Sequence, residues 1–182
     1  MKILNVDVLS NKLVTDNPVN RCYYCKQGVF GTILEAAKND GMTVILDGTN
    51  ASDDAGDRPG MKALQEMKVL SPLRMCGYVK SEIRKQSKEA GLFVYNKPSY
   101  ACLATRIPTG TEIDEEKIKQ VETAETFLFD LGFSDFRVRW MDNKAKIQMP
   151  ESQLQALMEK REIVLEELSK IFDEVLLDLR TR

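Results

Sequence analysis

Residues 95–110 read YNKPSYACLATRIPTG and show neither the helical nor the strand period of apolar residues. A proline disfavours helical backbone angles in the residue before it, so we expect Lys97 and Ile107 to be extended. The stretch therefore predicts an ordered loop between two halves of the chain whose sequence patterns differ. We expect the rest of the chain to be arranged around this loop.

Cys102 lies in this loop, four residues before Arg106. Positive charge near a cysteine favours the thiolate, which is the nucleophilic form of the side chain. A lone cysteine is more often a small buried apolar residue, and that alternative stays open here. Because Lys97, Ser99 and Thr105 also surround Cys102, we interpret it as a candidate reactive cysteine.

The composition is that of a folded protein. The chain has 182 residues, 43% of them apolar, so it can bury a core in one large domain or two small ones. Its net charge of −2 provides no overall positive field for nucleic acid or an anionic membrane. No apolar run approaches the roughly 20 residues of a membrane span, and the sequence does not begin with a signal-peptide core. We expect a cytoplasmic protein without nucleic-acid or membrane partners.

Histidine is absent from the sequence, which excludes Cys-His dyads and imidazole-ligated zinc. The four cysteines, in a chain without an export signal, favour thiol chemistry or metal binding over disulfides. Cys22 and Cys25 form a C-x-x-C pair at the start of a predicted helix, where thiol pKa values fall. The pair could be thiolates, a redox couple or metal ligands, or it could simply pack the start of the helix.

The first half of the chain predicts alternating strands and helices, which is typical of an α/β unit. Strands are expected at residues 2–9 and 42–46, with a further strand or extended piece at 69–73. Helices are expected at 21–40, with Asn20 as the N-cap and Gly41 as the stop, at 58–67, and at 80–91. The short apolar run 42–46 is typical of a parallel strand that is buried on both faces.

A polar segment, DGTN, follows the predicted strand 42–46. Doubly wound sheets bind ligands beyond the carboxyl ends of their strands, so Gly48, Thr49 and Asn50 are candidate nucleotide-binding residues. Arg58, which precedes Pro59 at the start of the next helix, could point its guanidinium at a phosphate. The alternative is that DGTN is an ordinary turn.

The second half predicts an α+β unit. A helix is expected at 112–131 with Gly132 closing it, then a hairpin of FRVRW and KAKIQM joined by MDNK, a helical stretch at 151–171 and a strand EVLLDL. Arg137 and Arg139 should lie on one face of the first strand, opposite Val138. Two such arginines can bind one phosphate or carboxylate, although paired basic residues on a strand more often form a solvated face.

The segments NRCYYCK, LDGTNASDD, DRPG, KPSYACLATRIPTGT and FRVRW, in this order and spacing, resemble the LarE family. These ATP-dependent sacrificial sulfur insertases build the nickel-pincer nucleotide of lactate racemase. The resemblance extends over essentially the whole chain, and KPSYACLATR is its most specific part. It implies a PP-loop domain that uses ATP and magnesium to adenylate a carboxylate on a pyridinium mononucleotide. A cysteine then gives up its sulfur and becomes dehydroalanine, or three cysteines hold an iron–sulfur cluster that supplies the sulfur.

Carried over residue by residue, the resemblance implies that Cys102 is the sacrificial cysteine. It implies phosphate-binding roles for Arg137 and Arg139, with Arg106 nearby, and places the metal- or substrate-facing acid at Glu125. The alternative sulfur source is a [4Fe-4S] cluster bound by three cysteines, Cys22, Cys25 and Cys102. Cys76 lies outside this set.

The sequence departs from the family in one respect. Family members begin with a strand and a Ser-Gly-Gly-x-Asp-Ser loop that binds ATP phosphates through backbone N–H groups, and this sequence contains no such loop. We therefore expect an N-terminally truncated PP-loop domain at residues 1–108, which includes the cysteine loop, and a small α+β domain at 109–182.

The expected function is ATP-dependent sulfur insertion into an adenylated pyridinium dicarboxylate mononucleotide, in a chain that forms homo-oligomers if it is complete. One alternative is an inactive fragment or a non-enzymatic binding or assembly subunit that relies on another chain for the ATP loop. A further alternative, a tRNA-thiolating PP-loop enzyme, is disfavoured by the acidic charge balance and the lack of a basic stripe.

Overall fold

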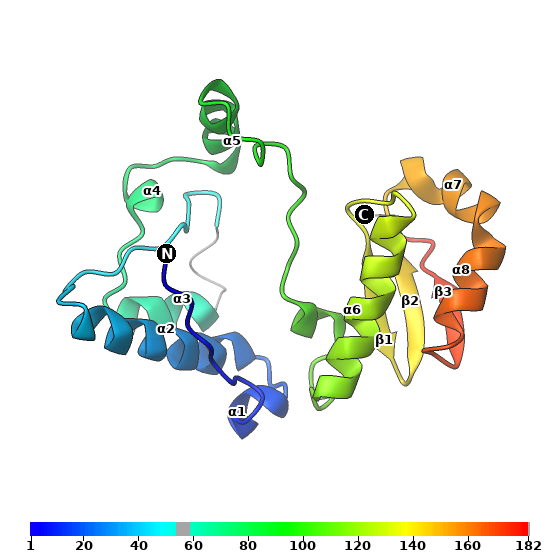
Figure 1. The fold of residues 1–182 in the computed structure, drawn as a ribbon, viewed down its shortest axis with the longest axis horizontal. Helices are drawn as coiled ribbons and strands as arrows, with labels where there is room; N and C mark the ends of the chain where they lie inside the picture. The colour runs from blue at the N-terminus through cyan, green and yellow to red at the C-terminus, as the bar shows by residue number, and fades with distance from the viewer. Residues whose placement is uncertain (54–58, 182) are drawn as a thin grey trace. The chain divides into compact units, whose positions relative to one another are not determined.

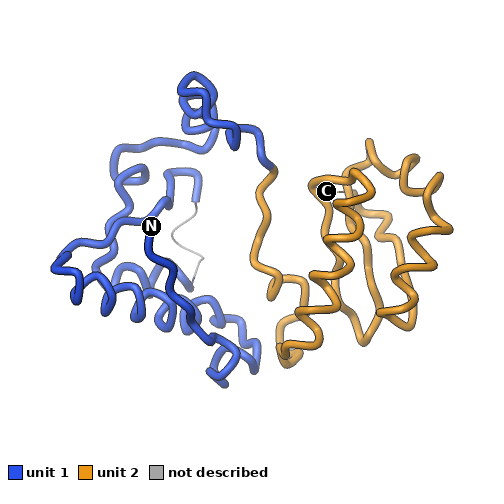
Figure 2. Tube along the Cα trace, in the orientation of Figure 1, with its two compact units in different colours: residues 1–97 blue, residues 98–182 orange. Residues whose placement is uncertain are grey.

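The computed structural model describes residues 1–53 and 59–181. The chain divides into two compact units, Met1–Lys97 and Pro98–Arg182 (Figure 2). This division lies on the N-terminal side of the boundary expected after residue 108. Cys102 and the rest of the loop from Pro98 onward therefore lie in the second unit.

The first unit is built mainly of helices (Figure 1). They are α1 (Lys12–Thr15), α2 (Arg21–Asn39), α3 (Pro59–Glu66), α4 (Pro72–Met75) and α5 (Lys80–Glu89). The longest, α2, ends before Gly41, whose φ of +74° is the left-handed conformation that commonly stops a helix. The helices expected at 21–40, 58–67 and 80–91 are confirmed within the described residues. Asn20 precedes α2 as expected, but its side chain makes no capping hydrogen bond.

Helices α2 and α3 pack against each other. The hydroxyl of Tyr23 donates to Glu66 Oε2 at 2.6 Å. At the start of α3, a Cβ on Gly60 would lie 3.0 Å from Cδ of Lys26, so the absence of a side chain lets the Lys26 stem cross Gly60 closely.

The prediction of strands in the first unit is largely wrong. Residues 2–9 form no strand, and Ile3 remains 77% exposed. The runs 42–46 and 69–73 meet only at a parallel bridge between Leu46 and Leu70. A strand is stabilised by a neighbour that pairs with its backbone, and no described residue pairs in this way with residues 2–9. The alternation of apolar and polar residues at 2–9 predicted a strand but did not show whether a pairing partner was present.

The second unit contains a three-stranded sheet with the order β1-β2-β3. The strands are β1 (Arg137–Met141), β2 (Lys144–Gln148) and β3 (Glu174–Leu177). β1 and β2 are antiparallel and joined by Asp142 and Asn143, whose φ values of +46° and +60° fit a tight hairpin turn. β3 pairs with β2 in parallel. The predicted hairpin and final strand are confirmed.

Helices cover one face of this sheet (Figure 1). α6 (Glu115–Asp130) packs on β1 and begins at Asp114, whose side chain accepts the Lys117 N–H. The helical stretch expected at 151–171 consists of η2 (Glu151–Gln153), α7 (Leu154–Glu159) and α8 (Arg161–Leu168), with Lys160 between the last two. The core contains apolar residues from helices, from strands and from the segment just before β1: Val121, Leu128, Phe136, Val138, Ile147 and Leu168.

The loop that precedes α6 contains a short 3-10 helix, η1 (Leu103–Arg106), and then Ile107 in extended conformation, as expected. In the described part of the chain, no helix combines the length and apolar character needed to cross a membrane.

Candidate functional site

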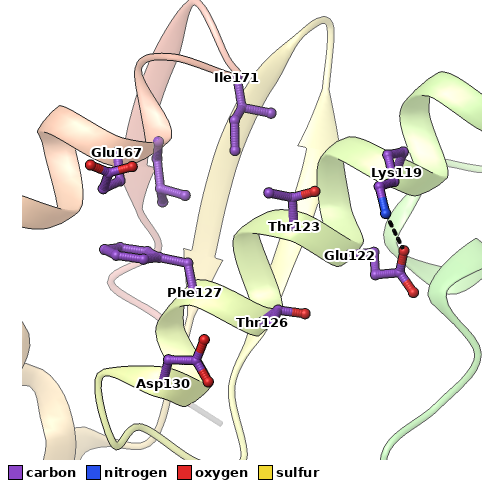
Figure 3. Close-up of a pocket in the computed structure, with 9 residues that line it drawn as sticks. Lys119, Glu122, Thr123, Thr126, Phe127, Asp130, Glu167 and Ile171 are labelled. Atoms are coloured by element: carbon purple, nitrogen blue, oxygen red, sulfur yellow. Dashed lines mark hydrogen bonds and ion pairs between the residues drawn. The ribbon is translucent and has the colours of Figure 1, made fainter.

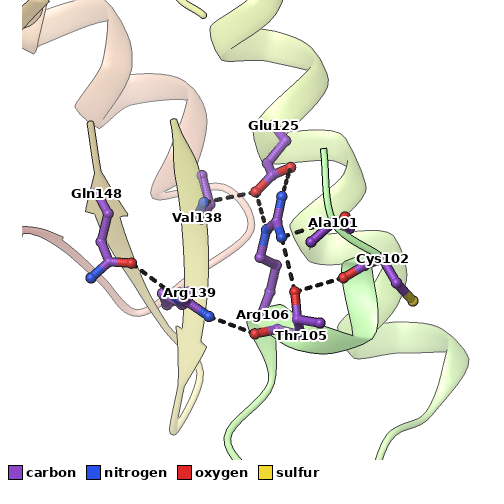
Figure 4. Close-up of polar contacts among 8 residues, drawn as sticks. All are labelled: Ala101, Cys102, Thr105, Arg106, Glu125, Val138, Arg139 and Gln148. Carbon is purple, nitrogen blue, oxygen red and sulfur yellow. Dashed lines mark hydrogen bonds and ion pairs between the residues drawn. The ribbon is translucent and has the colours of Figure 1, made fainter. Parts of the chain in front are cut away.

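Cys102 is exposed and immediately precedes η1 (Figure 4). Its carbonyl accepts two hydrogen bonds from Thr105, one from the backbone N–H at 2.9 Å and one from Oγ1 at 2.7 Å. The backbone of the turn is therefore held while the thiol stays accessible. The alternative that Cys102 is a buried apolar residue is wrong.

Arg106 is buried inside the unit and is only 1% exposed. It donates to Glu125 through Nε to Oε1 at 2.6 Å and through Nη2 to Oε2 at 3.0 Å. Glu125 Oε1 also accepts the Val138 N–H at 2.9 Å, and Arg106 Nη1 donates to Thr105 Oγ1 at 3.0 Å. This two-pronged pair ties the cysteine turn to α6 and β1.

Arg139 approaches the same turn from the sheet (Figure 4). Its Nη1 donates to the Thr105 carbonyl at 2.6 Å, and its Nε donates to Gln148 Oε1 at 2.8 Å. Gln148 in turn donates from Nε2 to Asp178 Oδ2 at 2.7 Å. Gln148 and Asp178 lie in no recognisable sequence motif, so neither was among the predicted site residues.

Arg137 lies two residues before Arg139 on β1, and both are half-buried, while Val138 between them is fully buried. The expectation that the two arginines share one face is confirmed. The neighbouring strands place further charges on this face, in ion pairs of Lys144 with Glu174 at 2.8 Å and of Lys146 with Asp178 at 3.1 Å.

The pKa of Asp178 is lowered to about 2. The largest cause is the hydrogen bond from Gln148, followed by those from the Arg180 N–H and Lys146. Asp178 therefore remains a carboxylate at neutral pH, and it acts only as a hydrogen-bond acceptor.

A hollow of about 370 Å³ lies beside Cys102. Tyr100 and Phe129 form an edge-to-face ring pair with centroids 5.0 Å apart, and both line it. The other lining residues are Ala101, Cys102, Leu103, Arg106, Glu122, Glu125 and Thr126. The thiol thus borders a mainly apolar space that could receive part of a small molecule.

A second hollow of about 480 Å³ lies between α6 and the region of α8 (Figure 3). Phe127 and Ile171 contribute apolar surface, and Lys119 pairs with Glu122 at 3.3 Å on its rim. None of the predicted site residues is among the residues that line it. The hollow beside Cys102 is therefore the better candidate for chemistry.

In the first unit, the segment DGTN forms a turn organised by Asp47, which sequence analysis did not single out. Asp47 accepts from Thr49 Oγ1 at 2.6 Å and from Ser71 Oγ at 2.6 Å. Partial burial raises the pKa of Asp47, but these hydrogen bonds and the charge of Lys26 outweigh it and leave the pKa below its ordinary value. Asp47 is the first residue of DGTN and could have been noticed in the sequence, but its partner Ser71, 24 residues further on, could not.

The other nucleotide-binding candidates lie in or near this turn. Asn50 donates from its backbone N–H and its side chain to Asp53 Oδ2, at 3.1 and 3.0 Å. Gly48 and Thr49 precede Asn50 in the same turn, whereas Arg58 lies outside the described residues. The ordinary-turn alternative therefore accounts for the hydrogen bonds seen here, and nucleotide binding stays a prediction.

The C-x-x-C pair lies at the start of α2, with Cys22 exposed and Cys25 half-buried. Both belong to the first unit, whereas Cys102 belongs to the second. Within each unit, the described Cys, Asp and Glu side chains form no group of three that could hold a metal ion. An iron–sulfur cluster on the three cysteines stays a prediction.

The chain is similar to a pyridinium-3,5-bisthiocarboxylic acid mononucleotide synthase. That protein, from Lactiplantibacillus plantarum, is 32% identical over 96% of this chain. Uncharacterized proteins of Synechocystis sp. and Methanocaldococcus jannaschii are 36% and 32% identical over 94% and 88% of the chain. The chain spans 63% of the length of each of these three relatives, and no protein-family model matches it.

Proposed function

We propose that this chain is a LarE-like protein and carries the sulfur-donating site of a sulfur transferase in cofactor biosynthesis. The observation that carries the proposal is an exposed thiol, Cys102, on a turn whose backbone is tied down from two sides by Arg106 and Arg139. A sacrificial cysteine must be accessible to its substrate and held in place against it. The similarity to the synthase of L. plantarum supports the same assignment.

The proposed reaction uses a pyridinium mononucleotide whose carboxylate has been adenylated. The Cys102 thiolate attacks the acyl carbon, and AMP leaves with the bridging oxygen, which gives a thioester. A base then removes the Cα proton of Cys102, the C–H electron pair becomes the Cα=Cβ bond, and the Cβ–S pair stays on sulfur. The products are a thiocarboxylate on the nucleotide and dehydroalanine at position 102.

The substrate phosphate is proposed to bind on the sheet face that carries Arg137 and Arg139. Arg106 and Glu125 were expected to contact the substrate as well. Arg106 and Glu125 are hydrogen-bonded to each other inside the unit, and their side chains are nearly inaccessible to solvent. We therefore propose that they support the cysteine turn and do not bind the phosphate. Arg139 would have both roles, since it also donates to the Thr105 carbonyl.

Adenylation requires ATP and magnesium, and the turn of Gly48, Thr49 and Asn50 beside Asp47 is the proposed nucleotide contact in the first unit. Hydroxyl, amide and carboxylate groups of this kind suit a ribose or a hydrated magnesium ion. The alternative of a binding or assembly subunit assigns the ATP-binding loop to another chain and keeps the cysteine site here.

The proposal is tested by giving the chain a preformed acyl-adenylate of the pyridinium dicarboxylate mononucleotide, which removes the need for ATP. Mass spectrometry of the protein should then show conversion of Cys102 to dehydroalanine, one per thiocarboxylate formed. The control Cys76→Ser should react like the parent and Cys102→Ser should form no thiocarboxylate. An intact Cys102 after thiocarboxylate has formed would overturn the assignment and favour the cluster of Cys22, Cys25 and Cys102.

A further inference from the structure

Gln148, at the end of β2, connects Arg139 to Asp178. We propose that Gln148 and Asp178 are positioning residues that orient Arg139 and, through it, fix the turn that carries Cys102. The inference rests on the proposed role of Cys102 as sulfur donor, which gives the turn its importance. Neither residue touches the thiol, so their effect must pass through Arg139 and Thr105.

The direction of each hydrogen bond in this chain follows from the groups involved. Arg139 can only donate, so the Gln148 atom that faces its Nε at 2.8 Å must be the carbonyl oxygen. The amide nitrogen then points to Asp178 Oδ2 at 2.7 Å, and a carboxylate can only accept. The hydrogen bond to Asp178 therefore fixes the Gln148 amide in the orientation in which its oxygen accepts from Arg139 Nε.

Asp178 is itself held on several sides, and its side chain is only 14% exposed. Its Oδ1 accepts the Arg180 N–H at 3.0 Å, and Lys146 Nζ lies 3.1 Å from Oδ2. Its own N–H donates to the Ile147 carbonyl at 2.9 Å, which continues the pairing of β3 with β2. The sheet thus supplies a fixed anchor for the chain of hydrogen bonds.

At the other end, Arg139 Nη1 donates to the Thr105 carbonyl at 2.6 Å. The N–H and the hydroxyl of the same threonine both donate to the Cys102 carbonyl. The polar chain Asp178–Gln148–Arg139–Thr105 therefore reaches the backbone of Cys102. The Arg106–Glu125 pair holds the same turn from α6, so loss of Gln148 should loosen the turn without unfolding the unit.

The test uses backbone hydrogen exchange, which requires neither substrate nor ATP. In Gln148→Leu, which cannot accept from Arg139, the Thr105 amide should exchange about tenfold faster than in the parent, the effect of losing one charge-assisted hydrogen bond. Gln148→Glu faces Asp178 with a second carboxylate and should also exchange faster. The double variant Gln148→Glu/Asp178→Asn reverses the polarity of that contact and should return the rate close to the parent value.

Gln120→Leu is the matched control, since Gln120 also bridges elements of this unit, bonding Trp140 Nε1 and the Ile171 carbonyl, but has no hydrogen bond to the turn. It should leave Thr105 exchange unchanged. The inference is overturned if Gln148→Leu leaves that rate unchanged, if the double variant fails to restore it, or if amides throughout β1 and β2 accelerate equally, since that would be a general loss of stability.

Sulfur transfer provides a second, separate readout with the preformed acyl-adenylate. At saturating substrate, Gln148→Leu should lower the rate of dehydroalanine formation at Cys102 about tenfold, and the double variant should recover the rate. If the parent transfers no sulfur, the proposed function fails while the exchange results still decide the positioning role. If exchange changes but the transfer rate does not, the turn is held for another reason and the positioning role in sulfur donation is overturned.

Discussion

Arg106 and Glu125 form a two-pronged ion pair, Nε to Oε1 at 2.6 Å and Nη2 to Oε2 at 3.0 Å, with side chains only 1% and 6% exposed. Removing one member leaves the other as a charge inside the unit. Glu125→Ala should therefore destabilise the second unit by about 3 to 5 kcal/mol, measured by denaturant unfolding. The exposed pair of Lys119 and Glu122 is the control, and Glu122→Ala should cost less than about 1 kcal/mol.

A double replacement separates structure from chemistry at this pair. Arg106→Met/Glu125→Leu removes both charges together and should recover most of the stability lost in Glu125→Ala. If the pair only supports the turn, the double variant should retain sulfur transfer at a reduced rate. Full stability together with complete loss of substrate binding would show that the two residues contact the substrate.

Arg137 and Arg139 should differ in their effects although they share a face of β1. Alanine at either position should weaken binding of the substrate phosphate about ten- to a hundredfold, the worth of a charge-assisted contact. Arg139→Ala should also accelerate exchange of the Thr105 amide, because Arg139 donates to the Thr105 carbonyl. Lysine should rescue binding only in part, since it lacks the planar fork. Parent-like binding by both alanine variants would place the phosphate elsewhere.

Asp178 should make stability depend on pH in the acid range. Its pKa is about 2 in the folded protein, below the ordinary value of about 3.9. A lowered pKa contributes stability that is present above the ordinary value and is lost as the pH falls towards about 2. The difference in unfolding free energy between the parent and Asp178→Asn should be constant above about pH 5 and shrink below it. A difference that does not vary between pH 5 and pH 2 would contradict the lowered pKa.

ATP binding by this chain should be weak. The sequence contains no Ser-Gly-Gly-x-Asp-Ser loop. In the family that the sequence resembles, backbone N–H groups of such a loop provide most of the contacts to the ATP phosphates. The turn of Gly48, Thr49 and Asn50 remains, and its own hydrogen bonds to Asp47 and Asp53 occupy several of its donors. Calorimetric titration with Mg-ATP should give a dissociation constant above the low-micromolar range. Tighter binding would contradict this, and Thr49→Val would then show whether the turn is responsible.

Local signals in the sequence were sufficient for most helices and for the hairpin. Gly41 and Gly132 mark helix ends because both adopt positive φ, and Asp142 and Asn143 adopt the left-handed angles that a tight turn needs. The alternation at residues 2–9 failed because a strand also needs a paired neighbour. A hydrophobic pattern describes one face of a segment and says nothing of what lies beside its edge.

The site could be predicted only in part for a similar reason. Cys102 was found because its loop breaks every periodic pattern and carries basic and hydroxyl residues. The role of Glu125 could not be predicted, since its pairing with Arg106 depends on how α6 packs against the loop. Gln148 ends β2 and Asp178 comes directly after β3, and only the pairing of the strands brings Gln148 to Arg139 and Asp178 to Gln148.

The parallel pairing of β3 with β2 also sets an order of events during synthesis. The hairpin of β1 and β2 joins neighbours in the chain and can form as soon as both have left the ribosome, whereas β3 follows only after α7 and α8. Asp178 comes directly after β3, so Gln148 lacks its partner until then. The turn of Cys102, made much earlier, therefore gains its full set of hydrogen bonds only once that later segment has emerged.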